Sequence, residues 1–258
     1  MTYSSLAAIV KYPYRSIDSV KKGKFGFFLS EAECFRTVAD ELGMIEKRPG
    51  VYARHPLVYL MEAADDICYQ VMDIEDAHKL KILTSRNVTE LFFSFFPDEK
   101  KQKMQRVIDM IADNNEKVAY MRSCVIGELV GECARVFVEN EDAILSGEFD
   151  GCLIDHISSL PLEGYQRCSK TAWDKIYNSS DVVDIELAGN QIITFLLDRL
   201  LDAVLHPEKN YSQLLLSRVP SQYDTASPTL YGKIQSVLDH ISGITDVYAL
   251  DLFRTPST

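Results

Sequence analysis

The chain has 258 residues, of which 47% are hydrophobic, and a formal net charge of −11. This size and composition predict a globular protein with one sizeable core or two small ones, and the acidic charge argues against broad binding to nucleic acid, whose affinity comes from Lys and Arg neutralising phosphates. No run of about 18 apolar residues is present and residues 1–5 do not resemble a secretory signal, so we expect a cytoplasmic protein that does not enter a membrane.

Two helices are predicted first. Apolar residues within 6–10 predict a helix that stops near Pro13. Ser30 and Glu33 have the spacing of a capping box, in which each side chain satisfies a backbone donor of the other residue, and the helix that they open should end at Gly43.

Basic residues gather around the end of the first helix. They are Lys11, Arg15, Lys21, Lys22 and Lys24. This clustering is consistent either with a solvated basic face or with a place where a triphosphate is bound.

A strongly apolar helix is predicted next. It should begin near His55, because Pro56 suits a first helical position. Its apolar residues cover more than one face, so we expect burial of most of Leu57, Leu60, Met61, Ala64, Ile67, Cys68, Val71 and Met72. Glu62, Asp65 and Asp66 should then lie in or beside the core. Since an unpaired carboxylate out of water is costly, we expect partners for them there.

One stripe of this helix carries chemistry. Asp65, Tyr69 and Asp73 are four residues apart, so each lies about 40° round the helix from the last and together they form one wall. Two interpretations of Asp65 remain open. It is either a ligand of a hard divalent cation, or a buried aspartate paired with Arg54 or Arg122.

The rest of the sequence is also helical in pattern, and alternating strand patterns are nearly absent, which predicts an all-α protein. Further helices are expected over residues 87–96, 98–113, 119–139, 191–204 and 228–241, and from residue 246 onward. Residues 147–164 are rich in glycine and proline and indicate a loop. We place a boundary there, between a core region, 1–150, and a C-terminal helical subdomain, 151–258.

The six cysteines show no CxxC or zinc-ribbon spacing, and most fall in apolar helical contexts. We expect free thiols at Cys34, Cys68, Cys124, Cys133, Cys152 and Cys168.

Several segments resemble, in the same order, bacterial deoxyguanosine triphosphate triphosphohydrolases, which belong to the HD-domain phosphohydrolase superfamily. The strongest match is EAADDICY at 62–69 followed by DIEDA at 73–77, which resembles the late metal-ligand helix of that family. The other matching segments are LAAIVKYP at 6–13, KFGFF at 24–28, AYMRSCVI at 119–126, FVENE at 137–141, ILSG at 144–147 and DHISGITDVYA at 239–249. In the last segment, Ile244 and Val247 stand where the family is expected to have methionine and arginine.

The resemblance implies an HD-domain-like multi-helix bundle and the hydrolysis of a deoxynucleoside triphosphate, such as dGTP, to the nucleoside and tripolyphosphate, with Mn²⁺ or Mg²⁺. It implies a metal ligand at Asp65, contacts to the deoxyribose from Tyr69 and Asp73, and contacts to the triphosphate from Lys11, Tyr12 and, more weakly, Lys24. The central helix would bring Tyr120 and Arg122 toward the nucleotide.

The chain also departs from the family. Members carry an N-terminal half with a histidine and a His-Asp pair as further metal ligands, whereas none of the five histidines here precedes an aspartate. We therefore expect the chain to match only the C-terminal half, with no catalytic residue of its own, and to be inactive alone. A partner N-terminal half or a homo-oligomer is expected.

Two other interpretations stay open. One is a non-catalytic regulatory subunit or remnant of the same fold that binds nucleotide or a partner chain. The other is a helical interaction module unrelated to nucleotides. Regulation by single-stranded DNA also remains open.

Overall fold

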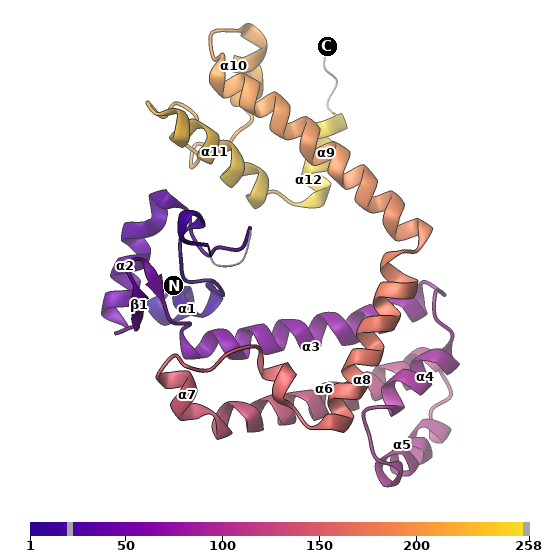
Figure 1. Cartoon of the computed structure of the whole chain (residues 1–258). Helices are drawn as coiled ribbons and strands as arrows, with labels where there is room; N and C mark the ends of the chain where they lie inside the picture. Colours follow the sequence, from indigo (N-terminus) through magenta and orange to yellow (C-terminus); the bar gives the residue numbers. More distant parts are fainter. Residues whose placement is uncertain (20–22, 255–258) are drawn as a thin grey trace. The chain divides into compact units, whose positions relative to one another are not determined.

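The computed structural model describes residues 1–19 and 23–254, which form α-helices and one short two-stranded sheet (Figure 1). The prediction of an all-α protein is confirmed. Contacts divide the chain into two compact units, Met1–Ile176 and Tyr177–Thr258, each of which is described by itself. Within the described ranges, no helix combines the length and apolar character that a membrane crossing requires.

The first unit starts with a small layer of short elements. They are α1 (Tyr3–Ile9), α2 (Ala32–Glu41) and an antiparallel hairpin of β1 (Glu46–Arg48) and β2 (Val51–Tyr52). Both predicted helices are confirmed. The capping interaction differs, because the backbone N–H of Phe28 donates to the carboxylate of Glu31, 2.8 Å away, and opens a 3₁₀ turn over Leu29–Glu31 ahead of α2.

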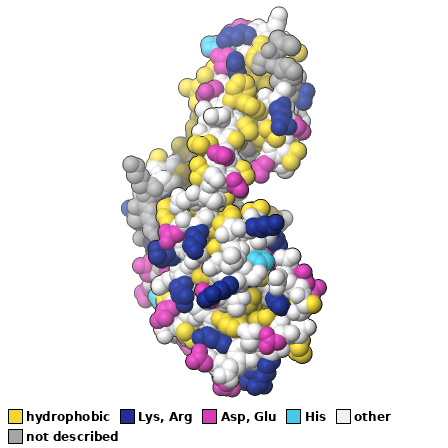
Figure 2. All heavy atoms as spheres, turned by 90° about the vertical axis from the view of Figure 1, so that its right-hand side faces the viewer, with side chains coloured by type: hydrophobic (Ala, Val, Ile, Leu, Met, Phe, Trp, Pro, Cys, Tyr) yellow, Lys and Arg dark blue, Asp and Glu magenta, His cyan; other side chains and the backbone are white. Residues whose placement is uncertain are grey.

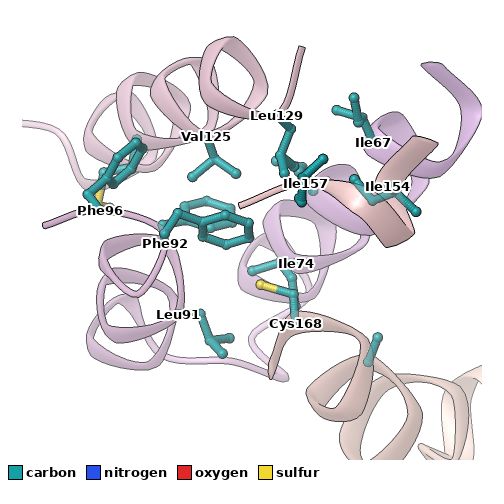
Figure 3. Close-up of a cluster of buried hydrophobic side chains, with 14 of the residues drawn as sticks. Ile67, Ile74, Leu91, Phe92, Phe96, Val125, Leu129, Ile154, Ile157 and Cys168 are labelled. Carbon is teal, nitrogen blue, oxygen red and sulfur yellow. The ribbon is translucent and has the colours of Figure 1, made fainter. Parts of the chain in front are cut away.

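The main helices of the first unit enclose its core. They are α3 (Pro56–Lys79), α4 (Ser85–Phe93), α5 (Asp98–Met110), α6 (Asn114–Glu139), α7 (Glu141–Leu145) and α8 (Ser159–Thr171). Helices α3 and α6 lie side by side (Figure 1). Their facing residues are fully buried, with Ile74 of α3 and Val125 and Leu129 of α6 around Phe92 and Cys168 (Figure 3).

Helix α3 buries only part of its surface. The side toward α6 and α8 is covered, and Ile67 and Val71 are buried there as predicted. The opposite side is exposed, and the predicted burial was wrong for Leu57, Leu60, Met61, Ala64 and Cys68. Periodicity shows which residues are apolar, but it does not show whether a second layer is present to cover them.

A helix replaces part of the predicted loop at 147–164. Helix α8 runs through Gly164, where a Cβ atom would lie 2.8 Å from the ring of Phe95, so α8 approaches the end of α4 at a distance that only glycine allows. A π-helical stretch, Ala172–Tyr177, continues it. Because α8 packs on α3 and α4, residues 151–176 belong to the first unit, and the units divide after Ile176 and not at the expected boundary of 150/151.

The second unit is a small helical bundle. It comprises α9 (Ser180–Leu205), α10 (Asn210–Leu216), α11 (Leu230–Gly243) and α12 (Asp246–Arg254). Its core forms where Leu200 and Val204 of α9 meet Val237 of α11. The helix predicted at 191–204 is the C-terminal part of the longer α9, and α10 was not predicted.

Candidate functional site

The predicted stripe lies on the exposed side of α3. Asp65 is exposed and forms neither a hydrogen bond nor an ion pair with any described residue. Tyr69 is 66% exposed, so its ring is not part of the core. Asp73 is partly buried. The predicted burial of Asp65 was wrong, because the wall that carries it faces solvent.

The two arginines considered as partners of Asp65 are engaged elsewhere. Arg54 pairs with Glu62 at 3.1 Å, and Arg122 pairs with Glu75 at 2.5 Å. Asp65 is therefore not the neutralised half of a buried ion pair, and its carboxylate stays available to a ligand.

Glu62 is buried in α3, as predicted, and Glu75 is the other buried glutamate of this helix. The Glu62 side chain is only 2% exposed, and one oxygen accepts from Lys11 Nζ at 2.6 Å and from the thiol of Cys152 at 3.1 Å. The other oxygen accepts from Arg54 at 3.1 Å, and Arg54 also donates to the backbone oxygens of Lys11 and Gly151. This network holds the end of α1 against α3.

The pKa of the Glu62 carboxyl reflects two opposed effects. Burial raises it, but the hydrogen bonds from Lys11 and Cys152 and the charge of Arg54 outweigh burial, so the net pKa is lowered. The pKa of Lys11 is raised in turn, chiefly by its hydrogen bond to Glu62. Both groups therefore stay charged at neutral pH.

Asp66 is in a different situation from its two acidic neighbours. It is half-buried and has no hydrogen bond or ion pair among the described residues. Burial, followed by the negative charge of Glu62, raises its pKa. Burial, followed by the negative charges of Asp66 and Glu132, raises the pKa of the Cys133 thiol to about 11, so that thiol is protonated at neutral pH. The six cysteines are free, as predicted.

Lys11 and Tyr12 border a cavity of about 270 Å³. Lys47 and Arg54 also line it, so three cationic side chains and one acid, Asp150, surround the space. The guanidinium of Arg54 lies 5.9 Å from the ring centre of Tyr12. The structure thus brings Lys11 and Tyr12 together beside the start of α3, at a place with an excess of positive charge.

The other predicted contacts are not gathered there. Lys24 is exposed on a loop, and Lys21 and Lys22 lie outside the described residues. Tyr120 packs against the main core, and Arg122 binds Glu75, which at 1.5 Å rise per residue is about 15 Å along α3 from Asp65. No described contact links Tyr120 or Arg122 to Asp65.

The described residues do not form a complete metal site. No group of three or more His, Cys, Asp or Glu side chains within residues 1–19 and 23–254 is arranged to hold an ion. Asp65 offers one exposed, unpaired carboxylate, whereas a hard divalent cation takes about six oxygen or imidazole ligands. Among the described residues, Asp65 could therefore supply one ligand of such an ion.

Sequence reasoning missed Arg54 and Lys47 as neighbours of Lys11. Arg54 precedes the start of α3 and could have been found as the cation that Glu62 requires. Lys47 lies in β1, a strand too short to show a pattern.

On the face shown in Figure 2, basic and acidic side chains are interspersed rather than gathered into a continuous basic strip.

Comparison with known proteins gives consistent matches. A Phosphohydrolase-associated domain matches residues 165–255. The chain is 30% identical, over 98% of its length, to a deoxyguanosinetriphosphate triphosphohydrolase-like protein of Pseudomonas aeruginosa (strain LESB58) and to one of Synechocystis sp., and 26% identical to a deoxyguanosinetriphosphate triphosphohydrolase of Yersinia pestis (strain Pestoides F). In each case it spans 59% of the length of the relative.

Proposed function

We propose that the chain belongs to the deoxyguanosinetriphosphate triphosphohydrolase family and forms the C-terminal part of a deoxynucleoside triphosphate triphosphohydrolase, because relatives with that name, or named as similar to it, match 98% of its length. The observation that carries the proposal is the stripe of Asp65, Tyr69 and Asp73, which faces solvent with Asp65 unpaired. In the proposed reaction, water attacks the α-phosphorus, the bond from that phosphorus to the 5′ oxygen breaks, and this oxygen leaves with a proton as the deoxynucleoside.

In this proposal the chain binds and orients the substrate. Lys11 and Tyr12 meet the triphosphate beside the basic cavity, since a lysine that keeps its charge is a natural partner of phosphate oxygens. Tyr69 packs against the 2′ carbon of the sugar and Asp73 accepts a hydrogen bond from the 3′ hydroxyl. Asp65 supplies one ligand to a Mn²⁺ or Mg²⁺ ion, whose role would be to polarise phosphoryl oxygens.

The exposed apolar side of α3 supports the proposal that another polypeptide segment, here called the complementing segment, completes the site. Ile9 of α1 and Leu57, Leu60 and Met61 of α3 line a groove of about 390 Å³. This apolar surface adjoins Asp65 on the same exposed side of α3, and contiguous apolar surface of this kind is typical of a docking site. We propose that a segment carrying the histidine and His-Asp ligands covers it, from a partner chain or from a second copy of a longer form.

The chain alone is expected to show no triphosphohydrolase activity. The physical reason is that one carboxylate cannot retain a catalytic metal ion. The test measures tripolyphosphate release from dGTP with Mn²⁺, first with the purified chain and then after adding the portion of the Pseudomonas aeruginosa relative outside the matched region. Turnover by the purified chain at the rate of the intact relative would disprove the expectation.

The stripe is expected to set sugar selectivity in a complemented enzyme. Tyr69→Ala should open space at the 2′ position and narrow the preference for dGTP over GTP, whereas Asp73→Asn should weaken binding of both by removing a charge-assisted hydrogen bond. The measurement is kcat/KM for the two nucleotides in each variant. An unchanged ratio in Tyr69→Ala would show that the ring does not contact the sugar.

A second function, nucleotide binding without catalysis, is favoured by the absence of a complete metal-ligand set in the described residues. The same complementation distinguishes the two. Binding of dGTP without tripolyphosphate release, in the presence of the complementing segment, would support a regulatory subunit.

A further inference from the structure

A second cavity lies in the N-terminal layer of the first unit, beside the hairpin of β1 and β2. It measures about 460 Å³, a volume suited to a small organic ligand. Tyr52 lines both cavities, but Lys11, Tyr12 and the stripe of α3 do not line this one. It is therefore separate from the proposed substrate site.

Three donor groups meet at this second cavity. Arg15 donates from Nε to Asp18 at 2.6 Å, which fixes its guanidinium while both Nη atoms make no hydrogen bond with a described residue. Among the described residues, Arg36 of α2 forms one ion pair, with Glu33 at 3.7 Å. The hydroxyl of Tyr52 likewise has no hydrogen-bond partner among the residues described.

The backbone at Gly50 leaves space for one of these donors, the guanidinium of Arg15. Gly50 stands at the turn of the hairpin with φ +75°, and a Cβ atom there would lie 3.2 Å from Nη2 of Arg15. Gly50 also donates its N–H to Glu46 at 2.8 Å, which occupies one carboxylate oxygen of that residue. The absence of a side chain at Gly50 therefore leaves the outer edge of the Arg15 guanidinium accessible.

Both arginines influence the pKa of the Tyr52 phenol. Burial raises the pKa of the Tyr52 phenol and the charges of Glu46 and Asp40 add to the rise, while Arg36 and Arg15 oppose it. Both guanidiniums are thus near the phenol, which agrees with their shared position around the cavity.

Apart from Glu33, Glu46 and Gly50, the rest of the lining is apolar. This apolar wall is formed by Phe27, Leu29, Ala32 and Pro49. The ring of Phe27 stacks on that of Phe35, with 4.4 Å between the ring centres. A ligand that satisfies the whole cavity therefore needs an anionic end for the donors and a flat, largely apolar body for the wall.

We propose that this cavity binds a nucleoside monophosphate, with its phosphate between Arg15, Arg36 and the Tyr52 hydroxyl and its base against Phe27 and Leu29. A phosphomonoester carries about −1.5 to −2 charge at neutral pH, and both guanidiniums can donate charge-assisted hydrogen bonds to its oxygens. A triphosphate is a poorer match, because Glu33 and Glu46 also line the cavity and would repel the additional charge.

The test is calorimetric titration of the full chain with AMP. AMP is chosen because its 2′ hydroxyl should exclude it from a deoxyribose site at Tyr69. Arg36→Gln and Tyr52→Phe should each weaken AMP binding, by about tenfold for the arginine, since a charge-assisted hydrogen bond to phosphate is lost. The matched control is Arg86→Gln. Arg86 is an exposed arginine of α4 that pairs with Glu90, and its replacement should leave AMP binding unchanged.

Inorganic phosphate tests the contribution of the base, and it should bind more weakly than AMP. Circular dichroism of each variant checks that it is folded. The proposal is overturned if AMP gives no saturable heat, if Arg36→Gln and Tyr52→Phe bind AMP as well as the parent chain, or if phosphate alone binds as tightly as AMP.

Discussion

Replacement of Asp65 by asparagine is expected to abolish metal-dependent hydrolysis in a complemented enzyme. The change keeps the shape of the side chain and removes the negative charge that a hard cation requires. Because even groups behind a metal ligand are worth roughly 10–100-fold in metal affinity or activity, loss of the ligand itself should exceed that range. The measurements are tripolyphosphate release and the affinity for Mn²⁺ by calorimetry.

Stability should be almost unaffected by the same substitution. Asp65 is exposed and has no partner among the described residues, so its replacement removes no packing and no ion pair. An Asp65→Asn protein with normal helical content and unaltered Mn²⁺ affinity would disprove the assignment of this residue as a ligand. A protein that fails to fold would instead contradict the exposed position of the side chain.

Replacement of Glu62 by glutamine is expected to give a large loss of stability, about 2–3 kcal/mol. Removing one partner of a fully buried ion pair costs roughly 3–5 kcal/mol. We expect a smaller loss here because the Lys11 side chain is 43% exposed and can regain solvation. Arg54 would keep its charge beside a neutral amide. The measurement is the free energy of unfolding in urea at neutral pH.

The effect of Glu62 should disappear in acid. Its folded-state pKa lies below the ordinary value of 4.5, so its stabilisation is fully present above about pH 4.5 and is lost as the pH falls through the lowered value. The parent and Glu62→Gln proteins should therefore converge in stability below that window. A difference that persisted unchanged would show that the cost comes from packing.

Asp66→Asn is the matched control on the same helix. The pKa of Asp66 is raised by burial, so its charge opposes folding at neutral pH, and removal of the charge should not destabilise the chain. Destabilisation of similar size in both variants would contradict a specific role for the Glu62 network.

The part of the site that could be predicted is the part encoded in one helix. Spacing alone places Asp65, Tyr69 and Asp73 on one wall of α3, and the cost of a buried acid correctly predicts a partner for Glu62. Which acid is buried could not be predicted, because Glu62 and Asp65 both lie in apolar surroundings in the sequence. Their burial depends on which side of α3 is covered by α6 and α8.

Elements that are stabilised by contacts distant in sequence could not be predicted either. Strands β1 and β2 are three and two residues long, too short for alternation to be visible. Helix α8 contains Pro161 and Gly164, both of which usually indicate a loop, and it forms because it packs on α3 and α4. The long, strongly periodic helices α3 and α6 were predicted because their signal is local.

The contact between Gly164 and Phe95 bears on how the fold can vary among related sequences. With a Cβ atom 2.8 Å from the ring, alanine at 164 is compatible with the observed approach of α8 only if the aromatic residue at 95 becomes smaller. These two positions, 69 residues apart in sequence, should therefore change together. In relatives where the glycine is replaced, a shorter side chain opposite it would identify the same crossing of helices without any structure.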